Sequence, residues 1–92
     1  MDPQAPMTIE QAIAIINMDV FGTLRKYKIR GYQHNSCRCP IAECVVLMVG
    51  YKVMVGSSTV RKADGIVFVG LPENIVEFIS EFDSGNHGEF RL

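Results

Sequence analysis

The sequence predicts a small single α+β domain, with helices packed on one face of a two- or three-stranded antiparallel sheet in the order α-α-α-β-β-β-α. Three observations predict this class. Apolar residues recur at helical spacing near both ends of the chain, residues 51–69 hold short β-branched runs, and Gly or Pro marks most element ends. The 92 residues suffice for one domain with a thin core. We assign 1–7 to a flexible lead-in and 8–92 to the domain.

The first predicted helix begins at Thr8. This residue is a suitable N-cap, and Gln11 three positions later completes a capping box. One helical face then collects the apolar residues Ile9, Ala12, Ile13, Ile16 and Val20. We expect Gly22 to interrupt the helix, a second short helix to span 23–29, and Gly31 to end it.

The third predicted helix follows directly on a Cys-Pro pair. Cys39 would be its N-cap, Pro40 its first residue, and Gly50 its left-handed end. Every residue after Glu43 is apolar, so we expect this helix to be buried nearly all round. The run 45–49 would also suit a strand, but the proline-first, glycine-last arrangement favours a helix.

Three strands and a last helix are predicted after Gly50. We expect a strand over 51–55, a turn over 56–58, and a hairpin in which Asp64-Gly65 joins 59–63 to 66–69. Because 66–69 is apolar on both faces, we expect it to be sandwiched. The last helix would begin at Pro72, end at Gly85, and bury one face, with the tail residues Phe90 and Leu92 available to pack; that face comprises Leu71, Ile75, Phe78, Ile79 and Phe82.

Composition excludes several classes of protein. The net charge is −1 and the pI about 6.1, so no overall charge attracts the chain to nucleic acid or anionic lipid. No apolar run has membrane-spanning length, and the start does not resemble a signal peptide. Three cysteines are an odd number and a poor basis for a disulfide framework. We therefore predict a cytoplasmic protein that has no cofactor and does not associate with membranes.

A basic segment is the candidate binding site. Between residues 20 and 42 there are five cations and no acid, with tyrosines interleaved. The candidate partner-binding residues are Arg25, Lys26, Lys28, Arg30, Tyr32 and Arg38. An acidic segment follows later in the chain, with Glu73, Glu77, Glu81, Asp83 and Glu89. Opposite charge poles would steer a protein partner or a second copy of the chain.

Two other interpretations of the basic segment remain open. Cations with interleaved tyrosines can also grip single-stranded nucleic acid, although no helix-turn-helix, RNP or GxxG signature accompanies them. Both charged segments can equally be ordinary solvated faces, because lysine and arginine stems often cover apolar surface.

The four residues His34, Cys37, Cys39 and Cys44 are the candidate metal ligands, and His87 could supply a fifth. Zinc prefers four tetrahedral ligands, with two thiolates separated by two or more residues. Only one residue separates Cys37 from Cys39, which is fewer than such a pair of zinc ligands needs. The alternative is that Cys44 simply fills a small apolar space.

A reactive thiol is a further alternative. Cys39 at a helix N-terminus should have a lowered pKa, and Cys37 could resolve its oxidised form. Only His34 or His87 could act as a base, and the sequence nominates no carboxylate to orient either one. Cys39 could equally be an inert cap.

Three segments resemble a group of small proteins from actinobacteria and their phages that has no assigned activity. They are Tyr27-Lys28-Ile29-Arg30-Gly31, Cys37-Arg38-Cys39-Pro40-Ile41-Ala42 and 78–85. The shared pattern is IRG…CxCP…LP…FD.G. Cys44 stands where the group has tyrosine, which implies a packing position, and the resemblance implies no catalytic residue. We therefore expect a non-enzymatic protein-binding module, such as a phage or bacterial accessory factor.

Overall fold

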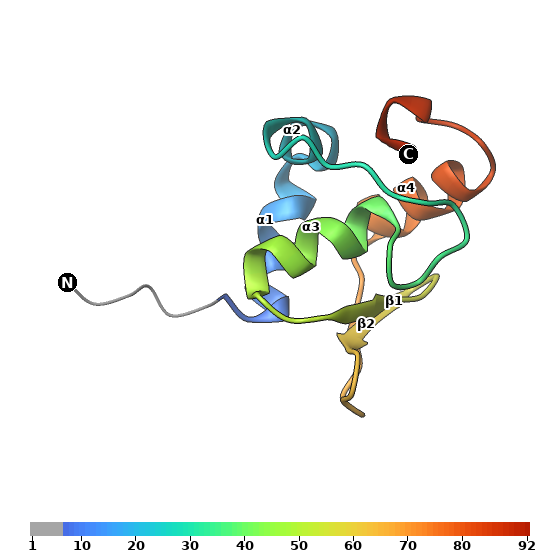
Figure 1. Ribbon diagram of the computed structural model, residues 1–92. Helices are drawn as coiled ribbons and strands as arrows, with labels where there is room; N and C mark the ends of the chain where they lie inside the picture. Colours follow the sequence, from blue (N-terminus) through green and yellow to red (C-terminus); the bar gives the residue numbers. More distant parts are fainter. Residues whose placement is uncertain (1–6) are drawn as a thin grey trace.

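Four helices and a three-stranded antiparallel sheet form one α+β unit, which confirms the predicted class and element order (Figure 1). The computed structural model describes residues 7–92, so all but the last residue of the predicted lead-in lies outside the described part. The elements are α1 (Ile9–Met18), α2 (Val20–Lys26), α3 (Pro40–Val49), β1 (Val53–Val55), β2 (Thr59–Lys62), β3 (Val69–Gly70), α4 (Glu73–Asp83) and the 3-10 helix η1 (Gly88–Phe90). Within residues 7–92, no helix is both long and apolar enough to cross a bilayer.

Helix α3 lies at the centre, in contact with α1 on one side and β1 on another (Figure 1). Its predicted ends are confirmed: Cys39 is the N-cap, Pro40 opens the helix, and Gly50 closes it with φ of 84°. The helix is buried over most of its surface, as expected, but Leu47 is 58% exposed. The helix packs on elements at its sides but nothing in the described chain covers the face that carries Leu47.

The break between α1 and α2 falls at Asp19, not at Gly22. The Asp19 carboxylate accepts a hydrogen bond from the Gly22 N–H at 3.0 Å and so caps α2, which begins one residue later. A Cβ atom on residue 22 would lie 2.1 Å from Asp19 Oδ2. Gly22 therefore does not break the helix but leaves room for its cap. The predicted capping box of Thr8 and Gln11 is confirmed.

The sheet has the strand order β1-β2-β3, and the helices cover one of its faces. Its strands are shorter than predicted: β1 starts at Val53, and Tyr51 precedes it. Val53 and Val55 are buried, as their alternation predicts. The turn 56–58 is confirmed by the hydrogen bond from Gly56 N–H to the Thr59 carbonyl at 2.8 Å.

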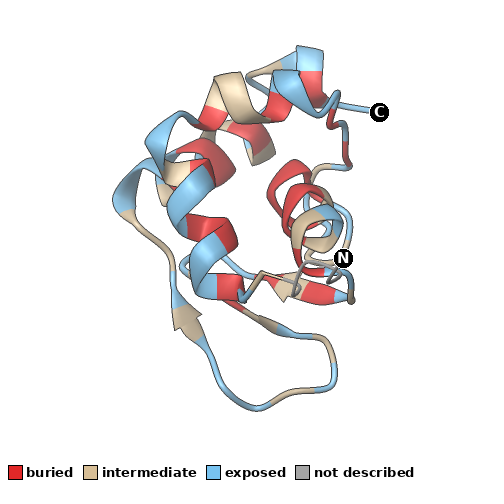
Figure 2. Cartoon of the chain, turned by 90° about the vertical axis from the view of Figure 1, so that its left-hand side faces the viewer, coloured by how far each residue is buried: buried red, intermediate tan, exposed pale blue. Residues whose placement is uncertain are grey.

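The hairpin between β2 and β3 is unpaired over the residues next to its predicted turn at Asp64-Gly65. Pairing between these two strands stops at Val60↔Val69. Arg61 and Lys62 still pair with β1, and residues 63–68 form a wide loop without buried residues (Figure 2). Ile66, Val67 and Phe68 are 88%, 74% and 61% exposed, so the prediction of a sandwiched strand is wrong. These three residues are exposed because the helices form a single layer on the sheet, and no described element covers this loop.

Helix α4 and the tail close the core. Residues Ile75, Phe78, Ile79 and Phe82 are buried as predicted, and Gly85 follows the helix with φ of 100°. Pro72 is the N-cap of α4 and not its first residue. Phe90 is buried, whereas Leu92 is exposed.

The chain also passes close to itself at Gly31, which does not end α2. Its N–H donates to the Phe90 carbonyl at 2.8 Å, and its own carbonyl accepts from the Leu92 N–H at 2.9 Å. A Cβ on residue 31 would lie 2.3 Å from the Arg38 carbonyl oxygen. Glycine is therefore needed here because three backbone segments converge.

Candidate functional site

The end of α2 exposes several basic side chains, of which Arg25, Lys28 and Arg30 line one hollow of the surface. The helix ends at Lys26, and Lys28 takes a left-handed φ of 54°. The Ile29 N–H donates to the Leu24 carbonyl at 2.9 Å and the Lys28 N–H to the Arg25 carbonyl at 3.1 Å, which is a Schellman ending. Ile29 is thereby buried, while Lys28 and Arg30 on either side of it are exposed. The prediction that this helix extends to Ile29 is wrong.

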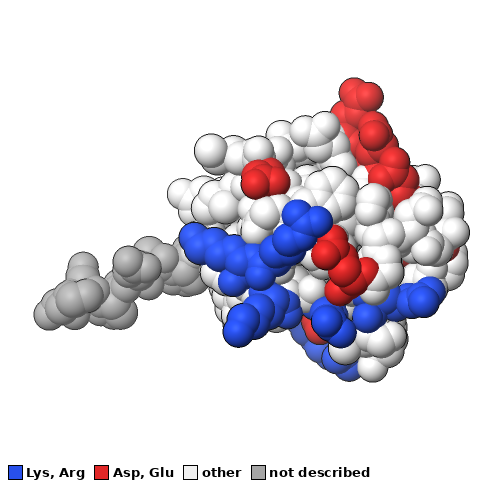
Figure 3. Space-filling model, turned by 90° about the horizontal axis from the view of Figure 1, so that it is seen from above, with Lys and Arg blue, Asp and Glu red and all other residues white. Residues whose placement is uncertain are grey.

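We call the exposed side chains Arg25, Lys26, Lys28, Arg30, Tyr32 and Arg38 the basic face. Seen from above, Lys and Arg side chains form a band across the molecule, with acidic side chains interrupting the band and gathering beyond it (Figure 3). All six predicted partner-binding residues are exposed. The structure thus places them on a surface where a partner can reach them.

The loop that follows brings Tyr32 beside Arg38. The Tyr32 N–H donates to the Arg38 carbonyl at 2.8 Å, and the Arg38 guanidinium lies 5.2 Å from the centre of the Tyr32 ring. Asn35 holds the turn, because its side-chain oxygen accepts from the N–H groups of Cys37 and Arg38 at 3.0 Å each. An aromatic side chain and a cation therefore stand together at one end of the basic face.

Intramolecular ion pairs involve only part of the basic face. Arg25 pairs with Glu89 at 2.7 Å and Arg38 approaches Glu43 at 3.7 Å. The hydrogen bond from Arg25 lowers the pKa of Glu89, and the same bond raises the pKa of Arg25. Lys26, Lys28 and Arg30 have no ion-pair partner among residues 7–92. The two predicted charge poles therefore touch within one chain, at Arg25 and Glu89.

The predicted metal ligands do not converge. In residues 7–92 no three His, Cys, Asp or Glu side chains form a group that could hold a metal ion. His34 faces α4 instead, where its backbone N–H donates to Asp83 Oδ1 at 2.9 Å. Cys44 is buried in the middle of α3. The three cysteines are free thiols.

The expectation of a lowered pKa at Cys39 is wrong. Its sulfur accepts a hydrogen bond from the Ala42 N–H at 3.4 Å, as a helix cap should. Burial raises the pKa of Cys39 to about 11, because loss of water outweighs the hydrogen bonds from Ala42 and Ile41. Burial likewise raises the pKa of Cys44 to about 11. The thiol that remains accessible is that of Cys37, which is half-buried.

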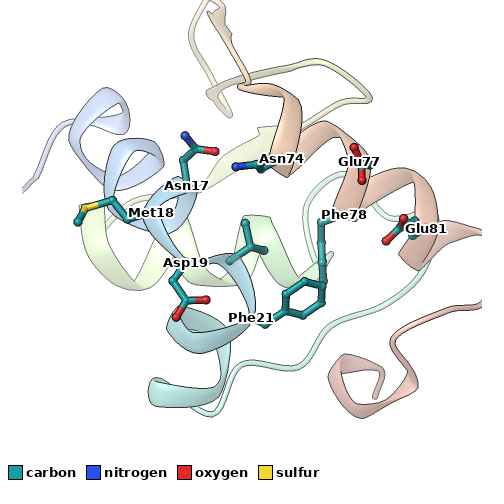
Figure 4. A pocket seen from close by; sticks show the side chains of 9 residues that line it. Asn17, Met18, Asp19, Phe21, Asn74, Glu77, Phe78 and Glu81 are labelled. Carbon is teal, nitrogen blue, oxygen red and sulfur yellow. The ribbon is translucent and has the colours of Figure 1, made fainter.

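A hollow of about 230 Å³ between the α1–α2 junction and α4 was not predicted (Figure 4). Its lining includes no hydroxyl, thiol or amine nucleophile; it consists of Asn17, Met18, Asp19, Val20, Phe21, Asn74, Glu77, Phe78 and Glu81. Figure 4 shows the Phe21 and Phe78 rings next to each other at one end. Only the Asp-x-x-Gly cap at Asp19 could have signalled this junction in the sequence.

His87 lies beside the hollow in an aromatic cluster. Its Nε2 is 2.7 Å from Glu81 Oε1, and its ring stacks on Phe78 with centroids 5.3 Å apart. Phe21 meets the same ring edge-on at 4.9 Å. Glu81 is thus the orienting carboxylate that the sequence did not nominate. The contact joins α4, which carries Glu81, to the turn that follows the helix.

Comparisons with protein-family models, with curated proteins and with solved structures give no match for this chain. The resemblance to the actinobacterial and phage group stays a prediction.

Proposed function

We propose that this chain is a non-enzymatic binding module that holds an acidic surface of another protein against its basic face. The observation that carries the proposal is the state of Lys26, Lys28 and Arg30. All three are exposed and come from five consecutive positions, and none is neutralised by an acid within the described chain. Unpaired cations that share one face attract an oppositely charged partner and speed its approach.

The neighbouring side chains support contact with a protein. Tyr32 and Arg38 are stacked at one end of the face, and tyrosine and arginine are enriched among the residues that dominate binding energy at protein interfaces. The loop that carries them is held by Asn35, so little ordering free energy would be spent on binding. A cytosolic accessory factor of a bacterium or phage is a role in keeping with such a surface.

Two arrangements support the choice against an enzyme or a thiol-redox protein. Residues 7–92 contain two carboxylate–histidine pairs. Glu81–His87 has no nucleophile in the lining of the hollow beside it, and His34–Asp83 is wide, with 3.9 Å between His34 Nδ1 and Asp83 Oδ2. Cys39, the thiol with the expected activating position, is buried and has a raised pKa.

Nucleic acid is the second candidate partner, because Tyr27 and Tyr32 are exposed among the cations of the basic face. Bases could stack on these rings while lysines contact phosphates. Such binding would weaken steeply as the salt concentration rises.

Affinity capture with three forms of the chain tests the proposal. The first is the wild type, the second carries Lys26→Glu, Lys28→Glu and Arg30→Glu, and the third keeps the charges with Lys26→Arg, Lys28→Arg and Arg30→Lys. We expect wild type and the charge-retaining form to capture the same protein from a bacterial lysate, identified by mass spectrometry, and the reversed form to lose it. Unfolding free energies should agree within about 1 kcal/mol, as is usual for surface changes.

Two results would contradict the proposal. Capture by the charge-reversed form would show that the basic face is not the binding surface. Capture that disappears after nuclease treatment would assign the face to nucleic acid.

A further inference from the structure

The hollow between the α1–α2 junction and α4 is lined by two kinds of side chain, and it lies apart from the basic face. Met18, Val20 and two phenylalanines are apolar, whereas the other lining residues are two asparagines and three carboxylates. Figure 4 shows Asn17 and Asn74 at the end of the hollow away from the phenylalanine rings. A molecule that suits this space therefore combines an apolar stem with a polar head.

Asn17 supplies a hydrogen-bond acceptor that the protein leaves unused. Its Oδ1 is buried, and within residues 7–92 it is the one such side-chain atom to which no group donates. Buried polar atoms of native proteins usually have a partner, so an exception calls for a donor from outside the chain. The terminal amide turns about a soft χ2 torsion, so a donor inside the hollow can bond to this oxygen. The head of the suited molecule therefore carries N–H or O–H groups.

The carboxylates of the lining also have capacity for further hydrogen bonds. Glu77 has no ion-pair partner among residues 7–92. Asp19 Oδ1 accepts from the Gly22 N–H and Glu81 Oε1 contacts His87, so one oxygen of each carboxylate is left for another donor. The two glutamates share one side of α4, because they are four positions apart. The acceptors thus come from both walls of the hollow.

The charge of the lining has one sign, which determines the charge of the head. Three carboxylates line the hollow, and no lysine or arginine of the described chain does so. Arg25 lies 5.8 Å from the centre of the Phe21 ring, but it is not part of the lining and its guanidinium is bonded to Glu89 at 2.7 Å. Like charges held close together repel, and a bound cation would relieve that repulsion. The head is therefore cationic.

Size and the number of acceptors decide between the candidate cations. The volume of about 230 Å³ is below the roughly 300–1,000 Å³ of most small-molecule pockets, so the hollow suits a group the size of one side chain. An ammonium group has three N–H donors, whereas a guanidinium has five in a planar fork that matches carboxylates. We propose that the hollow binds an alkylguanidinium group, carried by a small molecule or by an arginine side chain. Its stem packs on the apolar lining and its head bonds to Asn17 and Glu77.

NMR titration of the ¹⁵N-labelled chain tests the inference. The probes are butylguanidine, a capped peptide of arginine between two glycines, and the same peptide with lysine or citrulline in place of arginine. We expect saturable shifts of the Asn17 and Asn74 side-chain amide signals with both guanidinium probes. The lysine and citrulline peptides should bind about tenfold more weakly, because each lacks part of the charged fork. Tighter binding of the arginine peptide than of butylguanidine would identify a protein as the source, and the reverse a small molecule.

Matched variants locate the binding site. Glu77→Gln should weaken binding of the arginine peptide about tenfold, the usual loss for one charged hydrogen bond. Glu73→Gln is the control, because this residue belongs to the same helix but not to the lining, and it should leave affinity unchanged. Asn17→Leu should also weaken binding without lowering the urea midpoint, because an acceptor that has no donor does not stabilise the folded chain.

Three outcomes would overturn the inference. They are the absence of saturable shifts with both guanidinium probes, equal affinity for the lysine or citrulline peptide, and affinity that Glu77→Gln and Asn17→Leu leave intact. The triple charge reversal at Lys26, Lys28 and Arg30 lies outside the lining and should not change guanidinium binding. Failure here is therefore distinct from failure of the proposed function.

Discussion

The Arg25 guanidinium and the Glu89 carboxylate lie 2.7 Å apart, although the two residues are 64 positions apart in the sequence. A second, longer hydrogen bond of 3.5 Å from Arg25 Nε makes the pair bidentate. Both side chains are more than half exposed, so the pair adds little stability, but it links α2 to η1. It also places one acid inside the basic face.

Glu89→Gln should reduce the dependence of stability on pH at acid pH. The folded state lowers the pKa of Glu89 through the bond from Arg25. Its stabilising contribution is therefore present above the pKa of the unfolded chain and is lost as pH falls through the lower folded pKa. Urea unfolding at a series of pH values from neutral to acid measures this. A variant with the same pH dependence as the wild type would show that the pair does not persist in solution.

Thiol labelling should distinguish Cys37 from the other two cysteines. Cys39 and Cys44 are buried with pKa values of about 11, so at neutral pH they lack both access and thiolate. We expect one fast reaction with Ellman's reagent in the native chain and all three in urea. Peptide mapping after alkylation identifies the reactive residue. Rapid modification of Cys39 in the native state would contradict the burial described here.

Gly31→Ala should destabilise the fold by about 1–3 kcal/mol, the usual range for atoms forced into a packed site. The added Cβ would meet backbone atoms of Arg38, Cys39 and Pro40 at 2.3–2.7 Å, and none of these is the end of a flexible side chain. Gly70→Ala is the matched control, because no atom lies within 4 Å of a Cβ there. Thermal and urea unfolding compare the two. Equal stability of both variants would show that the crossing at Gly31 is not tight.

Local chemistry explains which parts of the fold could be predicted. The ends of α3 follow from Cys39, Pro40 and Gly50, and the start of α1 from Thr8 and Gln11, because each cap involves residues only a few positions apart. The buried face of α4 follows from its period alone. Signals of this kind need no knowledge of distant segments.

The features that were missed depend on segments far apart in the chain. Asp-Gly correctly indicated the register of the hairpin, but whether residues 66–68 are covered depends on where the helices lie. A helix N-terminus predicts a low thiol pKa, yet burial of Cys39 by the rest of the fold reverses the shift. The need for glycine at position 31 is evident only in the folded chain, where residues 90–92 bond to its backbone.

The candidate site was predicted as a set of residues but not as a surface. All six residues of the basic face are exposed, in agreement with their charge and sequence context. Their arrangement depends on Lys28, whose left-handed backbone no pattern indicated, and on Glu89, whose contact with Arg25 spans most of the chain. Sequence spacing contains neither kind of information.

The bridge between Gly31 and Arg91 has a consequence for the order of events during synthesis. Residues 25–38 leave the ribosome well before residues 88–92. The later segment forms the backbone hydrogen bonds with Gly31 and carries Glu89, the partner of Arg25. The residues of α1, α2 and α3 are therefore all synthesised before the segment that bonds to Gly31 and Arg25. The arrangement of the basic face described above is therefore complete only once residues 88–92 have been synthesised and have reached Gly31 and Arg25.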